Sequence, residues 1–181
     1  MDVPGLSIVR ERTEHGGAVL CFLSPLDAML EVERAEQIGR QLQIMRASDM
    51  DGSVFRDLDG LGLRASFHVG WLASGSKVLV GENGVLGRYT RDIHEWAGDP
   101  EFFELMPNSL EVFDDAYELA GLSAWHETNR RLQQGNEAQL REMAKKALDA
   151  VQIVKGQKDD CTGLALFDPE FMQWHFIKGE I

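Results

Sequence analysis

The sequence is poor in cysteine and has no long apolar run. Its 181 residues include only Cys21 and Cys161, which fit a reducing compartment as ordinary thiols. No stretch approaches the roughly 20 apolar residues that a membrane-spanning helix needs. Residues 1–5 (MDVPG) lack the basic start and apolar run of a secretory signal peptide. Together these absences predict a cytoplasmic protein.

Motifs for calcium and phosphate binding are also missing. An EF-hand loop needs an oxygen ligand five residues before its invariant glycine. Counting back from Gly52 and Gly60 gives Ala47 and Phe55 instead. The three glycines of segment 81–87 lie in a hairpin pattern, whereas phosphate loops lead from a strand into a helix. Ordinary turn chemistry explains both patterns, so we expect no cofactor.

The histidines suggest metal binding or catalysis only weakly. His94 and His126 each precede a glutamate, but a zinc-protease helix needs a second histidine four residues later, where glycine and arginine stand. A composite metal site from both His-Glu pairs stays open, because residues distant in sequence can converge. His68 or His175 could act as a general base only beside a substrate pocket and a partner carboxylate.

Cations are scarce, and this scarcity argues against nucleic acid as a partner. The chain has 30 acidic and 18 basic side chains, a net charge of −12 and a pI near 4.8. A nucleic-acid binder is typically basic, and an acidic surface repels anionic membranes as well. Arg141, Lys145 and Lys146 on the last long helix are typical of the solvated face of an amphipathic helix.

What the chain does contain is a concentrated acidic segment, residues 92–118. It holds nine of the carboxylates, and Arg91 directly before it is the nearest cation. The acids alternate with apolar and aromatic residues, which predicts short amphipathic helices with a carboxylate-rich outer side. Residues 130–158, in contrast, carry seven cations and three anions. Whether these two segments pair with each other is left open by the sequence.

The order of the patterns predicts an α+β fold in a single globular domain, residues 1–181, with helices packed on an antiparallel sheet. We expect an N-terminal hairpin, a helix, a three-stranded meander, four further helices and a C-terminal hairpin, over residues 6–23, 25–46, 62–90, 92–155 and 164–177.

Local signals place several boundaries of these elements. Ser24-Pro25 is a typical helix start, and that helix should end near Arg46. Asn83-Gly84 predicts a type I′ turn, in which both residues have positive φ. The last long helix should begin at Asn136 and continue through Val154, which lies on its apolar face.

These observations predict an acidic protein-binding module that neutralises or escorts a basic protein, with a bacterial immunity or antitoxin-type inhibitor as the best single hypothesis. The residues expected to bind the partner are Asp92, Glu95, Trp96, Asp99, Glu101, Phe102, Glu104, Glu111, Asp114, Asp115 and Glu118. One alternative is an enzyme whose site is assembled from scattered residues such as His68, His94, His126, Glu95 and Glu127. Another is an assembly component of a phage or secretion apparatus.

Overall fold

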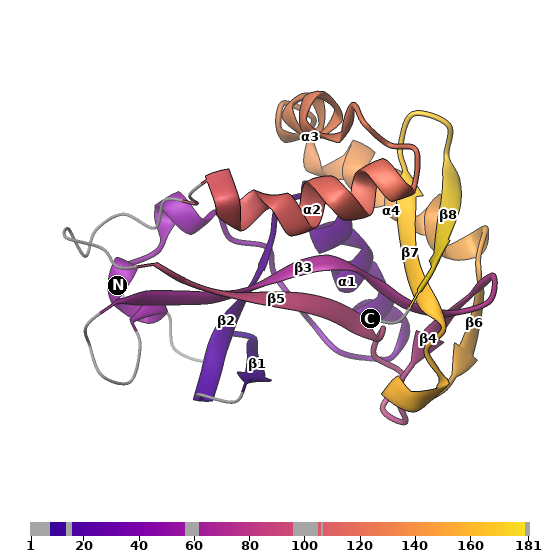
Figure 1. Ribbon diagram of the computed structural model, residues 1–181, viewed down its shortest axis with the longest axis horizontal. Helices are drawn as coiled ribbons and strands as arrows, with labels where there is room; N and C mark the ends of the chain where they lie inside the picture. The colour runs from indigo at the N-terminus through magenta and orange to yellow at the C-terminus, as the bar shows by residue number, and fades with distance from the viewer. Residues whose placement is uncertain (1–7, 14–15, 57–61, 96–104, 106, 180–181) are drawn as a thin grey trace.

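The computed structural model describes residues 8–13, 16–56, 62–95, 105 and 107–179. Within these ranges it has four α-helices and eight strands, so the predicted α+β fold is confirmed (Figure 1). The helices are α1 (Pro25–Gln37), α2 (Pro107–Leu119), α3 (Trp125–Gln133) and α4 (Glu137–Asp149). The strands are β1 (Arg10–Thr13), β2 (Gly16–Phe22), β3 (Leu63–Ser74), β4 (Lys77–Val80), β5 (Arg88–Glu95), β6 (Gln152–Lys155), β7 (Gly163–Asp168) and β8 (Gln173–Lys178). None of these helices has the length and apolar character to span a membrane.

The long strand β3 is shared by two half-sheets. Its first part pairs with β2 on one edge and with β5 on the other, and β1 extends the sheet beyond β2. Its last residues pair with β7 and β4, which β8 and β6 extend. In Figure 1 the two half-sheets diverge along the horizontal β3 ribbon. β2 and β7 therefore occupy the same edge of β3, one after the other.

The sheet is mixed, although a wholly antiparallel one was expected. β2 pairs with β3 in parallel, and β4 pairs with β6 in parallel. A parallel pair needs a crossover connection, which α1 supplies in the first case and the helices α2 to α4 in the second. The other pairings are antiparallel, including both terminal hairpins.

Helix α1 begins as predicted but ends earlier. The Ser24 side chain accepts a hydrogen bond from the Asp27 backbone N–H, as an N-cap does. At the other end Gly39 has φ +76°, and the Arg40 N–H donates to the Ala35 carbonyl oxygen. This Schellman arrangement closes the helix. The expected continuation to Arg46 is therefore wrong.

Two further local predictions need correction. The last long helix starts at Asn136 as expected, with a capping box to Gln139, but it ends at Asp149. Val154 instead belongs to β6, because pairing with β4 satisfies its backbone groups. In the turn after β4 only Gly84 has positive φ, so Asn83-Gly84 does not form a type I′ turn.

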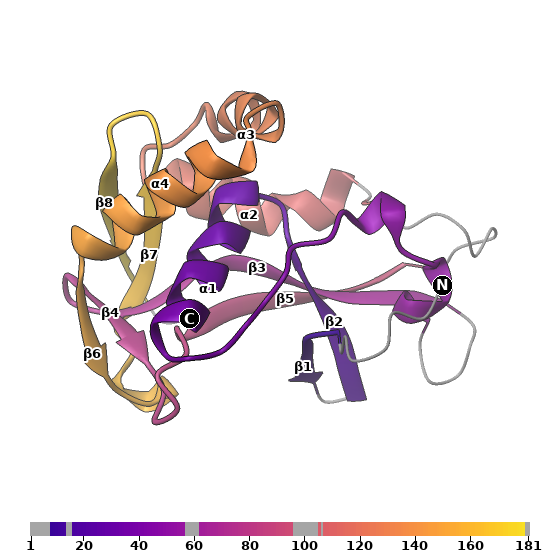
Figure 2. The ribbon, with the colours of Figure 1, turned by 180° about the vertical axis from the view of Figure 1, so that it is seen from behind.

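An irregularity in β3 decides which side chains face which helices. The register against β5 shifts between His68 and Gly70, a β-bulge. Before it Phe67 packs with Phe113 of α2, and after it Trp71 packs under α1 and α4. Because of the shift His68 and Trp71 lie on the same side, with ring centroids 4.2 Å apart. Figure 2 shows α1 and α4 in front of the sheet and α2 behind.

Candidate functional site

Helix α2 carries four acids on one side, which we call the acidic face of α2: Glu111, Asp114, Asp115 and Glu118. Their spacing of i, i+3, i+4 and i+7 places them together. The opposite side buries Phe113 and Ala116 against the sheet. Amphipathic spacing thus explains both the docking of the helix and the outward position of its acids.

Three of these acids are available to a partner. Glu111, Asp115 and Glu118 are exposed, and none of them forms an ion pair with a residue that the structure describes. Asp114 differs, because its Oδ1 accepts a hydrogen bond from Trp125 Nε1 at 3.0 Å and lies 2.8 Å from His126 Nε2. Asp114 therefore joins α2 to α3 as well as adding negative charge.

Five of the seven basic side chains of residues 130–158 form ion pairs with acids outside residues 92–118. Arg141 of α4 contacts Glu33 of α1 at 2.6 Å, and Lys145 lies 3.8 Å from the same carboxylate. Arg131 of α3 forms an ion pair with Glu170 beyond β7. In the described part of the chain no ion pair joins this basic segment to residues 92–118. Among the described residues, the cations of segment 130–158 therefore leave Glu111, Asp115 and Glu118 without an ion pair.

The other predicted partner-binding residues divide into two groups. Asp92 lies on β5 and is bound by the Arg64 guanidinium of β3 at 2.5 Å, so its charge is already compensated. Glu95 belongs to the end of β5, but its side chain lies outside the described residues. The same holds for the whole of Trp96, Asp99, Glu101, Phe102 and Glu104.

The histidines have unrelated surroundings. His68 is buried between Phe22 and Trp71, whereas His126 is exposed on α3 and stacks on Trp125. The side chain of His94 lies outside the described residues. Among the side chains that are described, no group of three or more His, Cys, Asp or Glu could hold a metal ion. His68 and His126 are thus not brought together.

A buried polar cluster lies beneath the start of α1. His68 Nδ1 is 3.9 Å from Asp27 Oδ2, and both side chains are removed from solvent. Burial raises the pKa of Asp27 to about 7, although Trp71, Tyr117 and Ser24 beside the carboxylate oppose the rise. Burial, and then the Arg88 charge, lower the pKa of His68 to about 3. At pH 5 both side chains are therefore uncharged.

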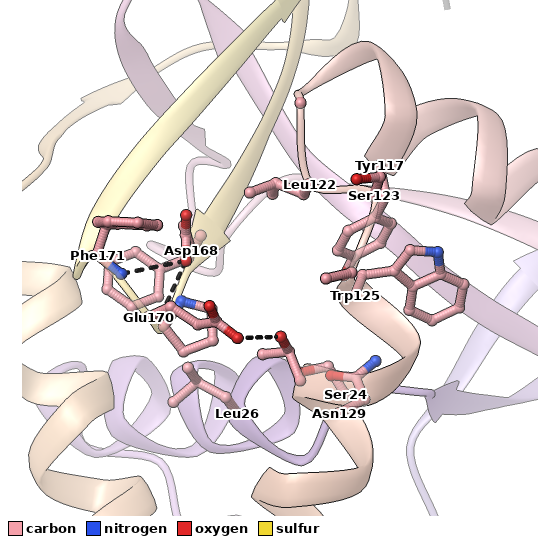
Figure 3. A pocket seen from close by; sticks show the side chains of 15 residues that line it. Ser24, Leu26, Tyr117, Leu122, Ser123, Trp125, Asn129, Asp168, Glu170 and Phe171 are labelled. Atoms are coloured by element: carbon pink, nitrogen blue, oxygen red, sulfur yellow. Dashed lines mark hydrogen bonds between the residues drawn. The ribbon is translucent and has the colours of Figure 1, made fainter.

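A pocket opens where the two half-sheets separate, and we call it the hairpin pocket. Its walls come from the segment after β2, from the end of α2 and the start of α3, and from the turn after β7, and they enclose a hollow of about 160 Å³. Figure 3 shows the turn after β7 on one side and the start of α3 on the other. Its walls include Leu26, Leu122, Trp125, Phe167, Asp168 and Phe171.

A second hollow, of about 280 Å³, continues along α3 towards α4. Its walls include Leu132, Leu140 and Met143, and it shares Thr128 and Glu170 with the hairpin pocket. Sequence reasoning missed both hollows, because their walls come from elements far apart in the chain.

No family model, curated protein or solved structure matches the chain.

Proposed function

We propose that this chain is a protein-binding module whose acidic face of α2 binds and neutralises, or escorts, a basic protein. The observation that carries the proposal is the uneven compensation of charge. Glu111, Asp115 and Glu118 have no ion pair with any described residue, while Arg131 and Arg141 are paired with acids elsewhere. Three exposed acids without an ion pair to a described residue therefore lie together on one helix.

An acidic surface attracts a basic protein electrostatically before the two proteins touch. A net charge of −12 attracts a cationic protein over a Debye length, about 8–10 Å in physiological salt. Complementary charge accelerates encounter and suppresses binding to acidic proteins. Within this class, an immunity or antitoxin-type inhibitor of a basic toxin is the form that we propose.

The first test is an affinity pull-down from the native host at low and at moderate salt, followed by mass spectrometry. We expect one basic protein that is released as the salt concentration rises. Its association rate should then be measured with a variant reversed at the three exposed acids, Glu111→Lys, Asp115→Lys and Glu118→Lys. Asp114 is left unchanged because it holds Trp125.

A matched control reverses three exposed acids on other elements, Glu82→Lys, Asp149→Lys and Asp159→Lys. Both variants change the net charge equally, so they differ only in where the charge is placed. We expect the α2 variant to slow association at low salt by at least about tenfold, and the control to slow it much less. Equal effects of the two variants, or no specific basic partner, would refute the proposal.

A further inference from the structure

We propose that the hairpin pocket receives one bulky apolar side chain from a basic segment of the partner, whose flanking cations lie along the acidic face of α2. This inference rests on the proposed function and adds the contact that would give short-range affinity. It assigns the pocket to a polypeptide that combines positive charge with a single aromatic or aliphatic anchor.

The pocket and the acidic face belong to one continuous surface. Tyr117 and Gly121 line the pocket, and Glu118 stands between them in the last turn of α2. Leu119 and Phe171 are each 75% exposed, and Phe171 forms part of the pocket wall. A segment lying along α2 would therefore reach the pocket within one helical turn of the acids.

The size of the pocket and the apolar part of its lining fit an apolar anchor, while Ser24, Ser123, Thr128 and Asn129 line the remainder with polar groups. Leu26, Leu122 and Phe167 contribute aliphatic and aromatic surface to its walls. Its volume of about 160 Å³ is close to the roughly 150 Å³ of an apolar cavity that accepts benzene. One side chain the size of phenylalanine or leucine can thus be accommodated.

Two acids line the pocket, and each has a basic side chain beside it. Asp168 and Glu170 both line it, and Asp168 is 5% exposed. Asp168 Oδ1 accepts hydrogen bonds from the backbone N–H groups of Glu170 at 2.8 Å and Phe171 at 3.2 Å. Glu170 is paired with Arg131, and His175 Nε2 lies 3.5 Å from Asp168 Oδ2. The uncompensated negative charge beside the pocket therefore comes from the exposed acids of α2, which favour an anchor flanked by lysine or arginine over an acidic segment.

The walls are held in place without a partner. Glu170 accepts a hydrogen bond from Thr128 Oγ1 at 2.7 Å, which ties the turn after β7 to α3. Trp125 is fixed on the other side by its bond to Asp114 and by stacking on Tyr117 at 4.7 Å. Because the pocket is already formed, little conformational entropy is lost in ordering its walls when a ligand binds.

The test uses two synthetic peptides, Lys-Lys-Lys-Phe-Lys-Lys-Lys and the same sequence with alanine in place of phenylalanine. Binding to the full chain is measured by calorimetry at about 20 mM salt, where screening is weak. We expect the phenylalanine peptide to bind at least about tenfold more tightly, since burying one such side chain is worth that much.

Pocket variants then locate the anchor. Ala124 is exposed and lines the pocket, so Ala124→Phe should fill the hollow and remove the advantage of the phenylalanine peptide. Ala138→Phe, on an exposed position of α4 outside both hollows, is the control and should change nothing. Leu122→Ala enlarges the hollow and should shift the preference towards a tryptophan peptide.

The outcomes separate this inference from the proposed function. If both peptides bind equally, and if the triple reversal on α2 weakens both to the same extent, the apolar anchor is wrong. The proposed acidic binding module would still be supported by that result. If the phenylalanine peptide binds tightly and the α2 reversal does not weaken its binding, the acidic binding module is wrong. The basic partner assigned to the pocket would then be wrong as well. If neither peptide binds at low salt, both proposals are wrong.

Discussion

The buried pair Asp27 and His68 predicts opposite pH dependences for two single variants, Asp27→Asn and His68→Gln. The ordinary pKa values are 3.8 and 6.5, and in the folded chain they become about 7 and about 3. The stabilising contribution of Asp27 is present below pH 3.8 and lost as the pH rises through 7. That of His68 is present above pH 6.5 and lost as the pH falls through 3.

The size of this pH dependence follows from the number of protons that Asp27 and His68 bind in the folded and in the unfolded state. Between pH 3.8 and 6.5 the unfolded chain holds one proton on His68, and the folded chain holds one on Asp27. In this pH range the pair therefore does not make the free energy of unfolding of the wild-type protein depend on pH. In Asp27→Asn only the unfolded state holds the proton, so stability rises with pH by about 1.4 kcal/mol per unit. The slope is smaller near the ends of this window, where His68 is only partly protonated, so the total gain is about 3 kcal/mol. In His68→Gln the sign is reversed.

The assay is urea unfolding of the three proteins in steps from pH 4 to pH 6.5. Other titrating groups, such as Glu31 with its raised pKa, are present in all three and cancel in the differences. We expect the difference between the two variants to change by about twice the single effect, roughly 6 kcal/mol. Parallel curves for all three proteins would refute the uncharged pair. They would show that, in the folded variants, the remaining His68 or Asp27 keeps its ordinary protonation between pH 4 and pH 6.5.

Two further predictions concern single side chains. A Cβ at Gly163 would overlap the Ile177 carbonyl oxygen of β8, so Gly163→Ala should destabilise the protein by more than about 2 kcal/mol in urea unfolding; an unchanged midpoint with native exchange of the β8 amides would contradict the tight β7–β8 contact. Burial raises the pKa of Cys21 to about 12, so its thiolate fraction at pH 8 is about a thousandfold below that of a free thiol. Iodoacetamide should label Cys21 correspondingly slowly in the folded protein, and labelling at the rate of the urea-unfolded chain would show that the site is open to solvent.

Helix starts could be predicted from the sequence because their signals are local. Ser24 and Asn136 each accept a hydrogen bond from a backbone N–H three residues later, and such a cap involves a single turn. The ends of the helices were more difficult to predict from the sequence than their starts. Gly39 marks the end of α1, yet Leu42 and Met45 continue the helical spacing beyond it. Helical spacing alone does not reveal a Schellman turn.

The strand pairings depend on distant parts of the chain. Val154 fits the apolar face of α4 as well as it fits a strand, and only the presence of β4 beside it decides. The acidic face of α2 follows from spacing and was predicted. The burial of Asp27 was not, because an acid in the first turn of a helix is ordinarily solvated and complements the helix dipole. The hairpin pocket was not predicted either, because its walls come from segments as far apart as Ser24 and Phe171.

The sharing of β3 by both half-sheets also bears on how the protein unfolds. Phe67 and Trp71 belong to two different hydrophobic clusters, one under α2 and one under α1 and α4, and stand four residues apart on one strand. If β3 leaves one cluster, it also leaves the other, so neither cluster can unfold while the other stays packed. The described elements should thus melt in one cooperative transition. Backbone amides at the centre of β3 should exchange with solvent only when the whole molecule opens.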